Sequence, residues 1–169
     1  MYSAVDIANW FVWKNQICKI ENQVDNDNYE VYEGLSHLKV QKLLYYAQGI
    51  SLALNNKKLF KESIVAWEHG PVVKEVYNKL CKNGRNDIPA VFSDKDLKNI
   101  EKIDSDLKAN NVLNIVYDNF GGYTAWQLRN GTHVVGGPWE TTVKKFGMNH
   151  KISDDLIKDY FVSKVLKSN

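Results

Sequence analysis

The stretch SHLKVQKLLYYAQGISLALNN at residues 36–56 decides the fold class. Ser36 belongs to the residue types that cap helix N-termini, and Asn55 with Asn56 predicts the end of the helix. A long helix between these two signals follows from the spacing of its apolar residues, which repeat on one face. That face is made of Val40, Leu43, Leu44, Ala47 and Leu54.

A second stripe on the same helix is polar and aromatic rather than charged. It consists of Gln41, Tyr45 and Gln48, which lie three or four positions apart. Residues at this spacing share one side of a helix. The stripe could line an interface with another protein or form a polar seam between helices.

The segments on either side of this helix are less regular. Ser3 and Asp6 form a capping-box pattern that predicts an opening helix, and the polar stretch from Glu21 to Glu33 predicts a solvated loop with room for one short strand. After residue 56, LFKESIVAW at 59–67 fits a short helix or a strand. Pro71 is predicted as the first residue of the next helix, because proline suits that position.

Start signals of the same kind continue to the end of the sequence. Ser93 with Asp96, Thr124, Pro138 and Ser153 each predict a helix start, and a further helical pattern restarts near residues 110–111. We therefore predict a mainly α fold, a compact bundle of about seven helices into which a short strand or hairpin also fits. No internal repeat or low-complexity linker divides residues 1–169, so one domain is expected.

Composition and charge exclude several classes of protein. Hydrophobic residues make up 44% and charged residues 25%, which is typical of globular domains. The net charge is only +2, which makes nucleic-acid binding unlikely in comparison with a strongly basic domain. The start of the sequence lacks the pattern of a secretory signal, and no stretch approaches the roughly 20 apolar residues of a membrane span. Two isolated cysteines suit a reducing cytoplasm.

The sequence contains no recognisable catalytic, cofactor or metal motif. Histidines and cysteines are scattered without the short spacings of a metal site, and the glycine pairs lack a phosphate-binding signature. Glu68 and His69 are adjacent and could be imagined as an acid and a base, but neighbouring side chains diverge in a helix or strand. His133 is expected to pin an irregular loop through backbone hydrogen bonds. We expect no cofactor and no enzyme activity.

Aromatic residues are frequent, with five Trp and nine Tyr. Trp10, Trp126 and Trp139 sit among helical-period apolar positions, which predicts packing in the core. A second group is placed less clearly, and partly exposed aromatics often anchor protein interfaces. This group comprises Trp13, Trp67, Tyr45 and Tyr46.

Three blocks together resemble a known family. LKVQKLLYYAQGISLAL at 38–54, IVAWEHGPVVKEVY at 64–77 and AWQLRNGTHVVGGPW at 125–139 are similar, in order and spacing, to the signature blocks of the Panacea domain family of SocA-like antitoxins and phage-associated proteins. With YSAVDIANWF at the start and ISDDLIKDYF near the end, the resemblance covers nearly the whole chain. The sequence departs from the family pattern in the polar stretch 21–33, which looks longer than the usual link between the first two helices.

The resemblance implies a helical antitoxin that binds and neutralises a cognate toxin protein by direct contact. Family blocks carried onto this sequence include residues that helix starts and core packing do not explain. These are our candidates for the partner-binding surface: Gln41, Tyr45, Gln48, Trp67, His69 and His133.

Other functions stay open at this level. A phage or prophage protein could use the same domain against a host factor. A DNA-binding autoregulator is a further alternative, although the low net charge weighs against it. An enzyme that reverses a toxin's modification through Glu68, His69 or His133 would be recognised by turnover at substoichiometric amounts. The sequence does not name the toxin or the oligomeric state.

Overall fold

The computed structural model is mainly α-helical, with one two-stranded antiparallel sheet among the residues that it describes, 1–24 and 34–167. This confirms the predicted fold class. The helices are α1 (Ala4–Val24), α2 (His37–Asn55), α3 (Lys74–Leu80), α4 (Asp94–Asp104), α5 (Leu107–Phe120), α6 (Ala125–Thr132), α7 (Pro138–Phe146) and α8 (Asp154–Tyr160). The strands are β1 (Ile64–Trp67) and β2 (Gly70–Val73). A 3-10 turn at Cys81–Asn83 follows α3, and a π-helical turn at Phe161–Val165 follows α8.

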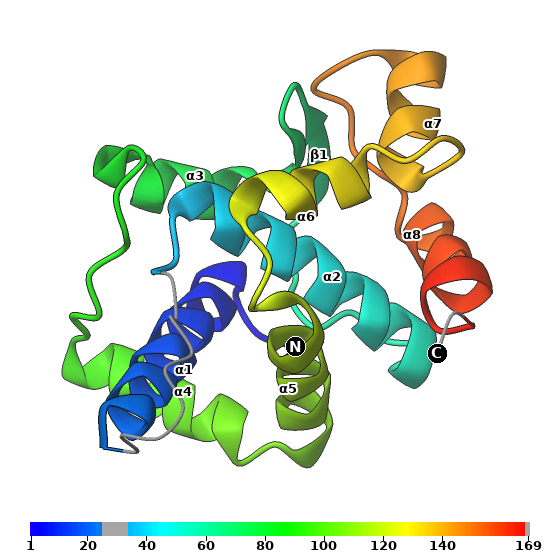
Figure 1. Cartoon of the computed structure of the whole chain (residues 1–169). Coiled ribbons are helices and arrows are strands. Elements are labelled where there is room, and N and C mark those ends of the chain that lie inside the picture. Colours follow the sequence, from blue (N-terminus) through cyan, green and yellow to red (C-terminus); the bar gives the residue numbers. More distant parts are fainter. Residues whose placement is uncertain (25–33, 168–169) are drawn as a thin grey trace.

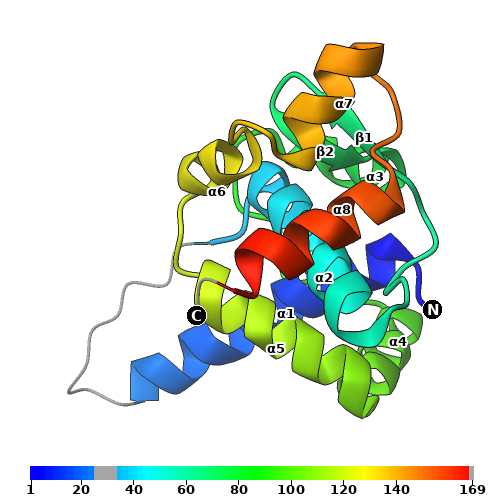
Figure 2. The ribbon, with the colours of Figure 1, turned by 90° about the vertical axis from the view of Figure 1, so that its right-hand side faces the viewer.

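Helix α2 runs through the centre of the molecule (Figure 1). It packs against α1, α5, α6, α8 and β2. Figure 2 shows α1, α4 and α5 on one side of α2, and α6, α7 and the sheet on the other. Every residue from Lys39 to Leu52 is buried, so the helix is enclosed all round rather than on the single predicted face. Leu54, predicted to lie on that face, is 48% exposed.

The segment after α2 forms a β-hairpin, which corrects the predicted helix start at Pro71. Strand β1 pairs antiparallel with β2, and Pro71 lies opposite Ala66. The Ala66 N–H donates to the carbonyl of His150 at 2.9 Å, and the Ala66 carbonyl accepts from the Asn149 N–H at 2.7 Å. Ala66 thus turns its backbone groups away from β2, so Pro71, which has no N–H, occupies a non-hydrogen-bonded pair. Helix α3 begins three residues later, at Lys74.

Most predicted helix starts are confirmed by capping bonds. Ser36, Ser93, Thr124 and Ser153 each accept a backbone N–H in the first turn of their helix, and Pro138 is the first residue of α7. The satisfied N–H groups are those without a partner inside the helix. These short-range signals therefore placed the starts of α2, α4, α6, α7 and α8.

Two predicted boundaries were wrong. Helix α1 continues to Val24, into the stretch predicted as a loop; residues 25–33, which make up the rest of that stretch, lie outside the described residues. Helix α5 starts at Leu107 rather than near residue 110, because the Asp106 carboxylate accepts the N–H groups of Lys108 and Ala109. Leu107, the first residue of α5, is 87% exposed.

The division of the aromatic residues into buried and exposed ones differs in part from the prediction. Trp10 is fully buried and Trp139 packs against the core, as expected, but Trp126 is 59% exposed. Its ring lies on α6 under the guanidinium of Arg129, 4.7 Å from the ring centroid. Tyr45 and Tyr46, which were possible surface anchors, are buried. They pack against Phe161 with ring centroids 5.4 and 5.9 Å away.

Candidate partner-binding site

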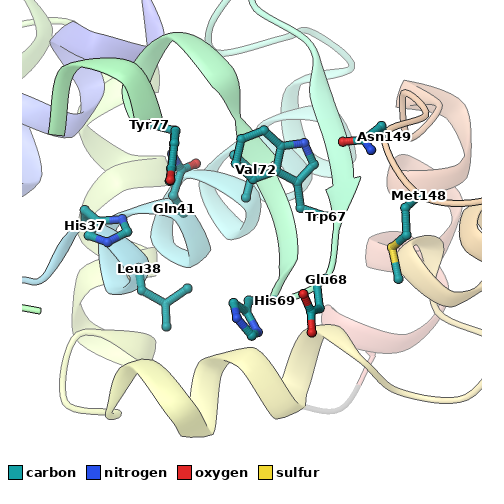
Figure 3. Close-up of a pocket in the computed structure, with 10 residues that line it drawn as sticks. All are labelled: His37, Leu38, Gln41, Trp67, Glu68, His69, Val72, Tyr77, Met148 and Asn149. Atoms are coloured by element: carbon teal, nitrogen blue, oxygen red, sulfur yellow. The ribbon is translucent and has the colours of Figure 1, made fainter. Parts of the chain in front are cut away.

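A pocket opens beside the hairpin turn, where α2, α3 and the segment between α7 and α8 meet (Figure 3). Its volume is about 580 Å³, within the range of ligand-binding pockets. Residues from six parts of the fold line it: His37, Leu38 and Gln41 from α2, Trp67 from β1, Glu68 and His69 from the turn, Val72 from β2, Tyr77 from α3, and Met148 and Asn149 from the α7–α8 segment.

Three rings form one wall of this pocket. The ring of Tyr77 lies edge-on to Trp67, with centroids 4.8 Å apart, and edge-on to His37, with centroids 5.8 Å apart. Edge-to-face packing at such distances is favourable. The wall is therefore held by contacts among its own rings, and Figure 3 shows Tyr77 between His37 and Trp67.

Two nitrogen atoms in the lining are buried and have no hydrogen-bond partner among the described residues. They are the indole Nε1 of Trp67 and the imidazole Nδ1 of His37. An unpaired buried donor costs about 1–3 kcal/mol, so most buried polar groups are paired. Burial also lowers the pKa of His37, with a smaller contribution from the charge of Lys42. This wall of the pocket is thus apolar, with unused hydrogen-bonding capacity.

The outer edge of the hairpin is closed by side chains from α2. The Gln41 carboxamide accepts from the Val73 N–H at 2.8 Å and donates to the Val73 carbonyl at 3.0 Å. The Lys42 ammonium donates to the Pro71 carbonyl at 3.1 Å. These bonds satisfy backbone groups that an edge strand would otherwise leave unpaired.

The turn of the hairpin is held from behind by the α6–α7 region. The Trp139 indole N–H donates to the Trp67 carbonyl at 2.8 Å. His133 lies against Trp139, with ring centroids 3.9 Å apart, and its ring nitrogens face the carbonyls of Arg129 at 2.7 Å and Glu68 at 3.3 Å. A neutral imidazole donates to one of these carbonyls, so the expected hydrogen bonding of His133 to backbone is confirmed, and the Trp139 bond holds the turn.

Gly70 allows this close assembly. Its φ is +103°, and a Cβ there would lie 2.8 Å from both Lys42 Nζ and Thr132 Oγ1. A positive φ favours glycine, and the space is already filled. Residues from three separate family blocks meet at this one point.

Burial changes the acid–base properties behind the hairpin. Desolvation, together with the nearby charge of Arg129, lowers the pKa of Lys42 to about 7. Desolvation also lowers the pKa of His133. Loss of water disfavours the charged form of a base, so these groups are poorly suited to remain cationic here.

The structure brings some of the predicted site residues together and separates others. Gln41, Trp67 and His69 line the same pocket, and His133 contacts the turn from its opposite side. Tyr45 and Gln48 are buried further along α2. The Gln48 carboxamide bonds to the backbone of residues 59 and 60, which follow α2 and belong to no helix, so these bonds do not form the predicted seam between helices. Partner binding by these six residues stays a prediction.

Sequence reasoning did not select His37 and Tyr77 for the site. His37 directly follows the cap of α2, and Tyr77 ends the family block that contains Trp67. Their place in the pocket becomes clear only when α2 and α3 are set beside the hairpin.

The described residues contain no group of three or more His, Cys, Asp or Glu placed to hold a metal ion. In the same part of the chain, no helix is both long and apolar enough to cross a membrane. Glu68 and His69 are exposed at the turn.

Comparisons with known proteins agree with this description. Residues 40–140 match the family described as "Antitoxin SocA-like, Panacea domain". The chain is 31% identical to the protein described as antitoxin SocA from Caulobacter vibrioides (strain NA1000 / CB15N), over 75% of this chain and 72% of that protein. No solved structure matches. Residues 40–140 contain the hairpin and its supports, while four residues of the pocket lie outside that range: His37, Leu38, Met148 and Asn149.

Proposed function

The chain belongs to the SocA-like antitoxin family defined by the Panacea domain, and from this membership we propose that it neutralises a partner toxin by binding that protein directly. Membership supports an antitoxin-type role. The observation that carries direct binding is the open apolar pocket on a hairpin turn held by α2, α6 and α7. An apolar surface that is already ordered loses little conformational entropy when it binds a protein.

The contact surface in this proposal is the hairpin face, defined as Trp67, His69 and the pocket beside them. His69 is exposed and Trp67 is half-buried, which suits aromatic anchors at the centre of an interface. Gln41 and His133 hold the hairpin in position. In this scheme Tyr45 and Gln48 support the fold behind the surface.

The test pairs this chain with the product of the adjacent gene. Co-expression should relieve the growth arrest that this product causes alone, and the two proteins should purify as a complex. A titration of toxin activity should reach zero only near equimolar amounts, because sequestration uses one antitoxin for each bound toxin. Relief of growth without a complex, or complete inactivation at a small fraction of equimolar, would contradict direct binding and favour an enzyme.

A further inference from the structure

We propose that the pocket binds a peptide segment of the toxin that inserts a large apolar side chain and presents a main-chain carbonyl to the Trp67 indole N–H. This rests on the proposed function and specifies the chemistry of the partner. It concerns how the hairpin face recognises the toxin, which the family assignment does not address.

The apolar side chain is inferred from the lining. Leu38, Val72, Tyr77 and Met148 surround the opening, and the cavity of about 580 Å³ has space for more than one side chain. Met148 is 42% exposed at the rim. Covering such a surface removes apolar area from water, which favours binding.

The main-chain carbonyl of the toxin segment is inferred from the indole N–H of Trp67, a donor that has no hydrogen-bond partner among the described residues. An indole nitrogen is a donor only, and Trp67 Nε1 has no partner among the described residues. In Figure 3 the exposed Asn149 side chain lies on the side of the indole that carries this nitrogen. A carbonyl of the partner that pairs with this N–H would satisfy a donor that the described residues leave unpaired.

Charge favours a neutral acceptor over a carboxylate. Among the described residues that line the pocket, Glu68 is acidic and none is Lys or Arg. Burial lowers the pKa of His37, which disfavours the cationic form of its ring. A carboxylate would lose water there without gaining a cation, whereas a peptide carbonyl is neutral.

Three variants of the full chain test the proposal by titration calorimetry with the purified toxin. Met148→Arg places a charge at the rim and should weaken binding at least about tenfold. Trp67→Phe keeps an aromatic ring but removes the N–H, and should weaken binding about five- to tenfold, the worth of one hydrogen bond. Leu107→Arg is the matched control, because Leu107 is 87% exposed on α5, away from the pocket; its affinity should equal that of the wild type.

The outcomes separate the two proposals. If the wild type forms no complex, both proposals fail. If a complex forms and Met148→Arg binds as tightly as Leu107→Arg, the pocket assignment is wrong while direct neutralisation stands. If only Trp67→Phe is unchanged, the carbonyl contact is wrong. Equal thermal unfolding midpoints for the three variants are required, so that loss of affinity reports on the surface.

A second measurement tests whether the occupant is a segment. Overlapping synthetic peptides that tile the toxin are added to the wild-type protein and to Met148→Arg. We expect at least one peptide to bind the wild type and to bind Met148→Arg at least about tenfold more weakly. If the complex depends on Met148 but no peptide binds, recognition requires the folded toxin and the segment proposal is overturned.

Discussion

At the scale of single residues, two neighbouring polar side chains of α2 form the hydrogen bonds to β2 that a third strand would otherwise form. Gln41 pairs with both backbone groups of Val73, and Lys42 bonds to the carbonyl of Pro71. Both side chains are buried. Because these groups close the sheet edge from inside the molecule, the polarity of both side chains serves the fold.

The burial of Lys42 predicts a pH-dependent stability. Its pKa is about 7 in the folded protein and near 10.5 for an ordinary lysine. Between these values the unfolded chain holds a proton that the folded chain lacks, so the free energy of unfolding should rise with pH. The contribution of neutral Lys42 to the free energy of unfolding is fully present above pH 10.5 and is lost as the pH falls towards 7. Urea unfolding at pH 7 to 9.5 should show this slope, and Lys42→Met should reduce it.

A surface lysine provides the comparison. Lys98 is exposed on α4, so Lys98→Met should keep the wild-type slope. Groups around Lys42 that share its surroundings include Arg129, His133 and His37. Measurements stop at pH 9.5 because tyrosines with raised pKa, such as Tyr46, affect stability at higher pH. Equal slopes for Lys42→Met and the wild type would show that the amine does not titrate in this range.

At the scale of elements, α8 and its π-helical turn approach α2 closely because of Gly49. A Cβ at Gly49 would fall 2.4 Å from the ring of Phe161. Gly49→Ala should therefore destabilise the protein by about 1–2 kcal/mol, since overpacking costs roughly 1–3 kcal/mol and the gain in helix propensity returns up to about 1 kcal/mol. Denaturant unfolding measures this change.

A double-mutant cycle assigns the cost to this contact. Phe161→Leu alone removes packing against Tyr45 and Tyr46 and is itself destabilising. Combined with Gly49→Ala, it makes room for the new methyl group, so the double variant should lose less stability than the sum of the single variants. Strictly additive losses would place the strain of Gly49→Ala elsewhere.

The elements that sequence predicted well are those specified by short-range contacts. Ser93 with Asp96 and Thr124 with Gln127 form their capping boxes within three residues, so their pattern is legible in the sequence. Pro71 shows the limit, because proline fits a first helical position and an edge strand equally well. Its place is decided by Lys42, 29 positions away, and by the pairing of β1.

The candidate site was predicted only in part for the same reason. Trp67 and His69 were selected as polar or aromatic residues left unexplained by the core, and they do line the pocket. Gln48 fitted the same criterion but bonds to the backbone of Leu59 and Phe60, at a separation of 11 and 12 positions. Residue type alone does not distinguish a buried amide with backbone partners from one at an interface.

At the scale of the whole molecule, stability should decrease outward from α2. This helix contacts elements from both ends of the chain and is buried from Lys39 to Leu52. Helix α4, by contrast, buries only Ile100 and Ile103 and packs at the edge of the molecule. Segments with few buried contacts open locally at lower free energy than the core. An opening of α2 would disrupt its packing against α1, α5, α6, α8 and β2 together.

Native-state hydrogen exchange tests this order. Amides of α2 should exchange last, with an opening free energy equal to the global free energy of unfolding, and amides of α4 should exchange earlier. Addition of the toxin should slow exchange in the hairpin, residues 64–73, because the proposed surface lies on it. The amides of α4 should still exchange before those of α2. Exchange of α2 at the same low free energy as α4 would mean that the central helix does not organise the fold, and the rigid support proposed for the hairpin would lose its basis.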